Sequence, residues 1–294
     1  MNREQFVSEV NGSGIEPENF NQIINDFSEY QNKAMKILRA IHNVCEKEKI
    51  NYQLAYGSLL GAIRDGGQIP WDYDIDIFVL GEERDRLISA LKNGLSDEYY
   101  IDSLEINKSC GHVISRVTLK GFDSRFLHVD IFYVMGTMKN DDEDLKRMVK
   151  ECALLYKAKA FNFIDKGTAS KRELLVMFEY KIKGLFKKKW TIWNRYKEVV
   201  MKHTINDCES VCSADRFSDW YDFSPSFFQN TKLIRTENGE FRIPVEYEKM
   251  LKIIYGDYKK IPPLEDRLKE LMRHYRFLQS DSRKRYGFNS CIEI

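Results

Sequence analysis

Three aspartates in two short apolar segments are the side chains in this sequence best suited to metal-assisted chemistry. Asp74 and Asp76 alternate with isoleucines, and Asp130 lies between Val129 and Ile131. Successive side chains of a strand point to opposite faces, so Asp74 and Asp76 should share a face about 6–7 Å apart. Carboxylates this close repel one another unless a cation neutralises them, and their oxygens suit Mg²⁺ or Mn²⁺. The pattern predicts a metal and catalytic site formed by Asp74, Asp76 and Asp130.

Each aspartate also has a simpler interpretation. A single aspartate on a half-exposed strand usually faces water. The combination of three favours the metal site, because an unpaired charge in the middle of a strand is costly to bury. His128 should share a face with Asp130. Asp130 is either a metal ligand or a general base that takes a proton from a substrate hydroxyl group. The sequence leaves both roles open.

A turn at Gly57 and Ser58 should open a helix over residues 59–64. Free backbone N–H groups at a helix start form an anion site, so these two residues are predicted to bind donor phosphates. Arg64 and Arg116 are predicted to assist, because guanidinium groups pair well with phosphate oxygens. The alternative for either arginine is an ordinary ion pair. For Trp71, stacking on a ligand is possible in principle, but packing in the core is favoured.

The elements that must position these residues follow from hydrophobic periodicity. Residues 20–50 read as a long amphipathic helix, and residues 208–240 as an irregular region. Strands are expected at 52–55, 74–80, 99–106, 112–119 and 127–134. Further helices are expected at 82–95, 141–162, 170–186, 191–205, 244–255 and 264–278.

These elements predict an α/β (α+β) fold with a mixed sheet flanked by helices and a mainly helical C-terminal half. The expected division is an N-terminal extension over 1–26, a catalytic core over 27–138, a helical portion over 139–280 and a frayed tail over 281–294.

Composition narrows the class of protein. The 46 lysines and arginines nearly balance 45 aspartates and glutamates, so no general nucleic-acid binder is expected. The six cysteines are scattered and no secretory signal or transmembrane run is visible, which favours free thiols in the cytoplasm.

Several motifs together resemble the LicD family, which includes bacterial phosphocholine transferases and the fukutin-related ribitol-phosphate transferases. The similar segments are Tyr56–Arg64, Ile69–Ile77, Phe241–Pro244, Leu251–Tyr258 and Pro262-Pro263. The resemblance runs from about Phe27 to Arg267. Tyr73 departs from it, because family members often carry an aspartate there.

The resemblance implies a nucleotidyltransferase fold, a divalent metal and a CDP-linked donor. The transferred group would be phosphocholine, most simply from CDP-choline, or a polyol phosphate, with cytidine monophosphate as leaving group. The carbohydrate acceptor would be a sugar of a cell-surface glycan or teichoic acid precursor. Two alternatives stay open: true nucleotidyl transfer and a catalytically inactive nucleotide-binding module.

Two further features carry weaker predictions. His203, Cys208 and Cys212 are close enough in sequence to form part of a zinc site, although ordinary buried thiols are the favoured interpretation. The stretch Lys181 to Trp193 mixes lysines with aromatic residues, so it is either a solvated helix face or a peripheral contact with the inner membrane surface.

Overall fold

The computed structural model of the chain describes residues 1–107, 110, 112–138, 189–213 and 222–282, with a few short stretches between 143 and 183. The helices predicted at 141–162 and 170–186 therefore lie mostly outside the described residues. Residues 184–188 of the basic stretch Lys181 to Trp193 and the tail from residue 283 lie outside them too.

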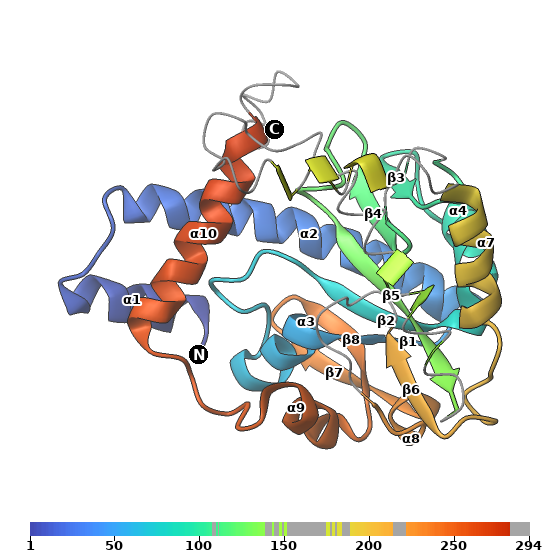
Figure 1. Cartoon of the computed structure of the whole chain (residues 1–294). Helices are drawn as coiled ribbons and strands as arrows, with labels where there is room; N and C mark the ends of the chain where they lie inside the picture. Colours follow the sequence, from blue (N-terminus) through green and yellow to red (C-terminus); the bar gives the residue numbers. More distant parts are fainter. Residues whose placement is uncertain are drawn as a thin grey trace.

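A mixed six-stranded sheet forms the centre of the part that the structure describes (Figure 1). Its strands are β1 (Tyr52–Leu54), β2 (Asp76–Leu80), β3 (Tyr99–Asp102), β4 (Ser115–Leu119), β5 (Val129–Thr137) and β6 (Ser210–Ser213). The order is β1-β2-β5-β4-β3, and β6 pairs with the later half of β5. The pair β2–β5 is parallel and the others are antiparallel. The predicted α/β class with a mixed sheet is confirmed.

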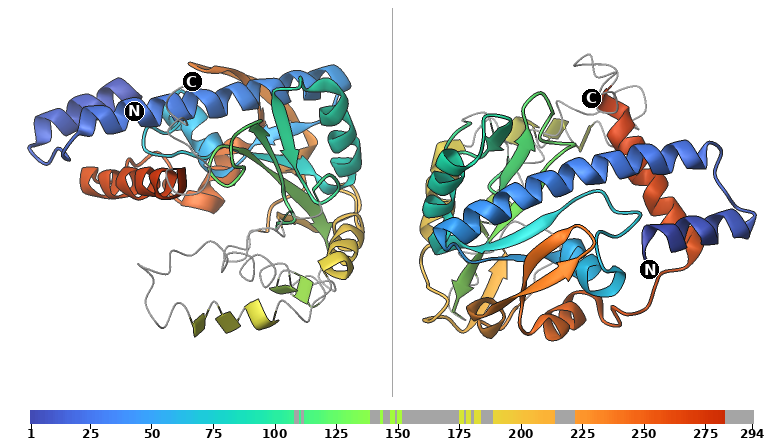
Figure 2. Two further views of the ribbon diagram at one scale, coloured as in Figure 1. Left: turned by 90° about the horizontal axis from the view of Figure 1, so that it is seen from above. Right: turned by 180° about the vertical axis from the view of Figure 1, so that it is seen from behind.

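One face of this sheet is covered by helices. The long helix α2 (Phe20–Glu48) runs across that face, and α4 (Arg84–Gly94) packs beside it (Figure 2). Apolar residues of α2 recur every three or four positions and are buried, as amphipathic periodicity predicts. Lys49 ends α2 in the left-handed conformation, and its N–H caps carbonyls of the last turn.

The region from 208 to 240, predicted to be irregular, contains regular structure. Besides β6 it holds α8 (Ser226–Gln229) and a hairpin of β7 (Thr231–Thr236) and β8 (Gly239–Pro244). A tight turn at Glu237 and Asn238 joins the two strands, and Gly239 begins β8 with a positive φ of 138°. Buried Phe241 and Ile243 attach the hairpin to the core.

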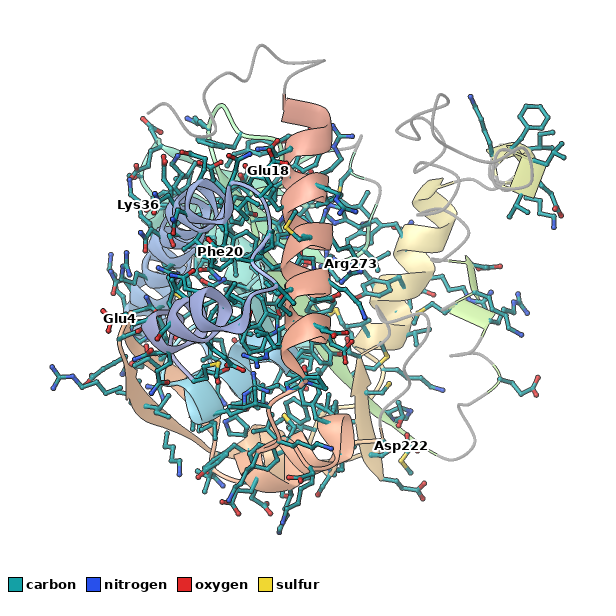
Figure 3. The ribbon with its side chains drawn as sticks, turned by 90° about the vertical axis from the view of Figure 1, so that its left-hand side faces the viewer. Glu4, Glu18, Phe20, Lys36, Asp222 and Arg273 are labelled. Carbon is teal, nitrogen blue, oxygen red and sulfur yellow. The ribbon has the colours of Figure 1, made fainter. Side chains whose placement is uncertain are left out.

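Both ends of the described chain pack against the segment that precedes β2. Helix α1 (Arg3–Ser13) places Phe6 against Trp71, with ring centroids 5.2 Å apart. Helix α10 (Leu264–Ser282) is tied to α1 by an ion pair between Arg267 and Glu9. Figure 3 shows α10 beside α1 and α2; Phe20 marks the start of α2, and Arg273 lies on α10.

Five further helices have defined bounds in the described part of the chain. They are α3 (Tyr56–Leu60), η1 (Gly61–Asp65), η2 (Gly81–Glu83), α7 (Lys189–Val200) and α9 (Tyr247–Tyr255). Across the described residues, no helix combines the length and apolar character needed to span a membrane.

Candidate active site

A row of four charged residues crosses the sheet. Asp76 of β2 pairs in register with Asp130 of β5, Asp130 pairs with Arg116 of β4, and Arg116 pairs with Asp102 of β3. Register partners in neighbouring strands point to the same face, so all four side chains share one face. The sequence predicted Asp76 and Asp130 for the site, and the register brings them to adjacent strands.

Asp130 is held by two basic side chains. Arg116 Nε donates to Asp130 Oδ1 at 2.6 Å, and Arg116 Nη2 donates to Oδ2 at 3.4 Å. His128, which directly precedes β5, places its Nε2 3.5 Å from Asp130 Oδ1. Burial alone would raise the pKa of Asp130, but Arg116 and His128 outweigh it and hold that pKa well below its ordinary value. The carboxylate is therefore ionised throughout the physiological range.

Ser58 positions the start of β2. Its Oγ accepts a hydrogen bond of 2.8 Å from the backbone N–H of Asp76. The helical turn that carries Ser58 begins at Tyr56, earlier than the predicted 59–64, and continues as the π-turn η1. Tyr56 has a left-handed φ of 42°, and the rings of Phe78 and Phe132 pack around it. The binding of donor phosphates by Gly57 and Ser58 stays a prediction.

Asp72 joins the predicted aspartates, although it precedes the strand that was expected at 74–80. Its carboxylate lies against Gly57, where an added Cβ would meet Asp72 Oδ2 at 2.8 Å. Burial, followed by repulsion from Asp74 and Asp76, raises the pKa of Asp72 well above its ordinary value. Asp72, Asp74 and Asp76 therefore form one electrostatic group before and at the start of β2.

Helix α10 contributes His274 to this group. His274 Nδ1 lies 3.0 Å from the backbone oxygen of Trp71 and 3.8 Å from Asp72 Oδ1. Its ring also packs against Tyr73, with centroids 4.8 Å apart. Burial lowers the pKa of His274, so the neutral ring is favoured. The C-terminal helix thus fixes the loop that carries Asp72 and Asp74.

Arg64, one of the predicted phosphate ligands, is engaged elsewhere in this structure. Its Nη2 donates to Asp65 Oδ2 at 2.8 Å, and its guanidinium lies 5.7 Å from the ring centroid of Trp71. Trp71 is only 6% exposed, which agrees with a packing role. A role for Arg64 toward a donor phosphate remains a prediction.

The acidic group fits a divalent cation by its chemistry. Asp72, Asp74 and Asp76 supply carboxylate oxygens, the ligands that Mg²⁺ and Mn²⁺ prefer. Arg116 is paired with Asp130, whereas Asp72 experiences repulsion from both neighbouring aspartates. A bound cation would relieve that repulsion. His203, Cys208 and Cys212 do not come together as a cluster of metal-ligand atoms within the described residues.

Residues 49–168 match the family model described as LicD/FKTN/FKRP, nucleotidyltransferase domain. The chain carries a LicD-family nucleotidyltransferase domain. It is also similar to the lipopolysaccharide cholinephosphotransferase LicD of Haemophilus influenzae, with 25% identity over 264 residues, covering 81% of this chain and 93% of that protein. Together the two likenesses support a phosphotransferase of LicD type.

The LicD-family domain contains every residue predicted for the site. Gly57, Ser58 and Arg64 lie near its beginning, and Asp74 and Asp76 follow. The domain also includes Arg116, His128 and Asp130. His274 lies beyond the matched residues, so α10 completes the surroundings of Asp72 from outside that range.

Proposed function

We propose that this protein transfers phosphocholine from a CDP-linked donor to a sugar of a cell-surface glycan precursor, with the help of Mg²⁺ or Mn²⁺. The observation that carries the proposal is the group of Asp72, Asp74 and Asp76, with Asp76 beside Asp130 on the neighbouring strand, inside a LicD-family domain. The similarity to a lipopolysaccharide cholinephosphotransferase supports the choice of transferred group and acceptor class.

Asp74 and Asp76 are the residues that we assign to the metal. When bound, a divalent cation there would act as a Lewis acid that stabilises charge on the phosphate oxygens. Ser58 holds the backbone at Asp76 through its hydroxyl, and Gly57 leaves space for the Asp72 carboxylate. These local contacts position the carboxylates before any ligand arrives.

Asp130 suits the role of a fixed anion better than that of a general base. A general base works best when its pKa lies near the working pH. Arg116 and His128 hold the pKa of Asp130 far below that range. Asp130 would therefore complete the metal environment, and Arg116 would add a positive charge beside it that favours a donor phosphate.

The decisive experiment combines a donor panel with product mass. Full-length protein is incubated with CDP-choline, CDP-ribitol or CDP-glycerol, Mg²⁺, and a lipooligosaccharide acceptor. Release of cytidine monophosphate with a gain of phosphocholine mass is the expected result with CDP-choline. A gain of nucleotide mass would identify true nucleotidyl transfer instead. Release with a polyol donor alone would reassign the transferred group.

Two controls separate metal chemistry from nonspecific breakdown. Asp76→Asn should show no product above background under the same conditions, while exposed Asp97→Asn should match the unmodified protein. If the protein binds CDP-choline but none of the donors is consumed with any acceptor, the inactive binding module becomes the better interpretation.

A further inference from the structure

A second polar cluster lies between β3 and β4, apart from the aspartates assigned to the transfer reaction. Cys110 Sγ lies 3.4 Å from His112 Nε2, and His112 Nε2 lies 3.4 Å from Asp102 Oδ2. Within the described residues, these three side chains form the group whose metal-ligand atoms all lie within 4.8 Å of one another. Cys110 is fully buried, and the side chains of His112 and Asp102 are about nine-tenths buried.

We propose that Asp102, Cys110 and His112 bind a zinc ion or a divalent cation with the same ligand preference. Thiolate, imidazole and carboxylate are the ligands of protein zinc sites. Zinc bonds of about 2.3 Å to sulfur and about 2.0–2.2 Å to nitrogen and oxygen place neighbouring tetrahedral ligands roughly 3.3–3.6 Å apart. The two separations of 3.4 Å fall in that interval.

Each ligand is already oriented by a second contact. His112 Nδ1 lies 2.8 Å from the backbone oxygen of Ile114, so a proton on Nδ1 leaves the Nε2 lone pair available. Asn107 Nδ2 donates to Asp102 Oδ1 at 2.9 Å, which directs Oδ2 toward the cluster. Cys110 Sγ lies 3.4 Å from both Nδ1 and Nε2 of His112, so the thiol already packs against the imidazole ring.

The charges of the cluster suit a divalent ion. Asp102 accepts hydrogen bonds from Ser124 Oγ and Asn107 Nδ2, which favour its ionised form. Burial, together with nearby Arg116, lowers the pKa of His112 and keeps the imidazole neutral. One carboxylate and one thiolate would balance two positive charges, and a neutral imidazole is the form that binds metal.

Arg84 gives the cluster a rigid frame. This buried guanidinium donates to Glu105 Oε1 at 2.7 Å and to the backbone oxygen of Val113 at 2.8 Å. It also lies 4.0 Å from the ring centroid of Tyr133 on β5. The chain is therefore held at Glu105 and at Val113, on both sides of Cys110, before a metal binds. This lowers the entropic cost of metal binding.

The cluster is connected to the proposed active site through one strand. Asp102 is the register partner of Arg116, and Arg116 forms the bidentate pair with Asp130. A metal on Asp102 would stabilise the β3–β4 pair and so the backbone that presents Arg116. The ion has a structural role in this assignment, and its ligands are separate from Asp74 and Asp76.

Cobalt substitution tests the site without relying on activity. Purified full-length protein is treated with a chelator and then titrated with Co²⁺. Cobalt binds at zinc sites in place of zinc, and its absorption spectrum shows which ligand types surround it. One equivalent should produce a thiolate-to-cobalt charge-transfer band in the near ultraviolet and tetrahedral bands in the visible. Protein from zinc-supplemented cells should contain close to one zinc per chain by mass spectrometry of the metal.

Four variants show which residues produce the signal. Cys110→Ser should abolish the charge-transfer band, and His112→Gln should weaken cobalt binding at least tenfold. Cys208→Ser should keep the band, because that thiol lies outside the cluster. Asp76→Asn should also keep it, since the proposed transfer site has no sulfur ligand.

The outcomes that overturn the proposal are equally specific. The proposal is wrong if the unmodified protein gives no charge-transfer band, or if Cys110→Ser keeps both the band and the zinc. Loss of the band in Cys208→Ser with retention in Cys110→Ser would transfer the site to the other cysteine region. If circular dichroism shows that Cys110→Ser does not fold, the cobalt affinity of His112→Gln is the test. An unchanged affinity in this variant would then reject the proposal.

Discussion

Asp76 and Asp130 are register partners in the one parallel pair of the described sheet, so two carboxylates from distant parts of the sequence leave the same face side by side. The backbone N–H of Asp130 also donates a hydrogen bond of 2.8 Å to the carbonyl oxygen of Ile75, which strengthens the pairing of the two strands. Parallel strands need a crossover connection, and here α4, β3 and β4 lie between them. The acidic site is therefore a product of topology as well as of sequence.

The first prediction concerns these two carboxylates. Asp76→Asn and Asp130→Asn should each reduce turnover by roughly a hundredfold or more, because each removes fixed charge from the reacting centre. Far-ultraviolet circular dichroism should stay unchanged for Asp76→Asn. Turnover is measured as release of cytidine monophosphate, with Asp97→Asn as the control on an exposed site. Near-normal turnover in Asp76→Asn would remove this aspartate from the metal site.

The second prediction concerns the pair of Arg116 and Asp130. Arg116→Met leaves a buried carboxylate without its main partner, so the free energy of unfolding should fall by about 3–5 kcal/mol. Adding Asp130→Asn to the same chain should recover part of that loss, because the unpaired charge is removed. Urea unfolding of the single and double variants measures both effects. Strictly additive losses would show that the two side chains are not coupled.

Much of this site could be predicted from sequence, because alternation along a strand is a local property. That rule selected Asp74, Asp76 and Asp130, and it placed His128 beside Asp130, which the structure confirms. The rule missed Asp72, because the expected strand began only at residue 74, and Asp72 reaches the site through close approach to Gly57. His274 could not be found in this way, since its contact with Trp71 joins residues 203 positions apart.

The fold shows the same division between local and long-range information. The periodicity of residues 20–50 predicted α2 closely, because an amphipathic helix carries its pattern in every turn. The hairpin β7–β8 was predicted as irregular although Asn238-Gly239 is a sequence signal for a tight turn. Strand β6 has only four residues, and its place depends on pairing with distant β5. Local patterns could not supply that pairing.

The third prediction uses the space at Gly57. An added methyl group would meet the Asp72 carboxylate at 2.8 Å, so Gly57→Ala should displace Asp72 while leaving the core intact. Turnover should fall on the order of tenfold to a hundredfold, as expected when a reacting group is misplaced by a fraction of an ångström to an ångström. The melting temperature should change little. Gly12→Ala is the matched control, because its Cβ would meet no atom within 4 Å.

The last prediction concerns pH and the pair that frames the β3–β4 segment. The pKa of Glu105 is lowered overall, because its contacts with Arg84 outweigh the effect of burial. A carboxylate with a lowered pKa stabilises the fold above its unfolded pKa of about 4.3, and this contribution is lost as pH falls through the folded value. Glu105→Gln should therefore lower the free energy of unfolding at pH 7 by about 1.5–3 kcal/mol.

The difference between the unmodified protein and Glu105→Gln should then shrink as pH falls below about 4.3, since the carboxyl becomes protonated in both the folded and the unfolded chain. Urea unfolding in steps from pH 7 to the lowest pH at which the protein stays folded measures this convergence. Glu18→Gln, a substitution at an exposed glutamate, should change stability little at every pH. A difference for Glu105→Gln that stays constant across the series would show that the ion pair with Arg84 does not stabilise the segment through charge.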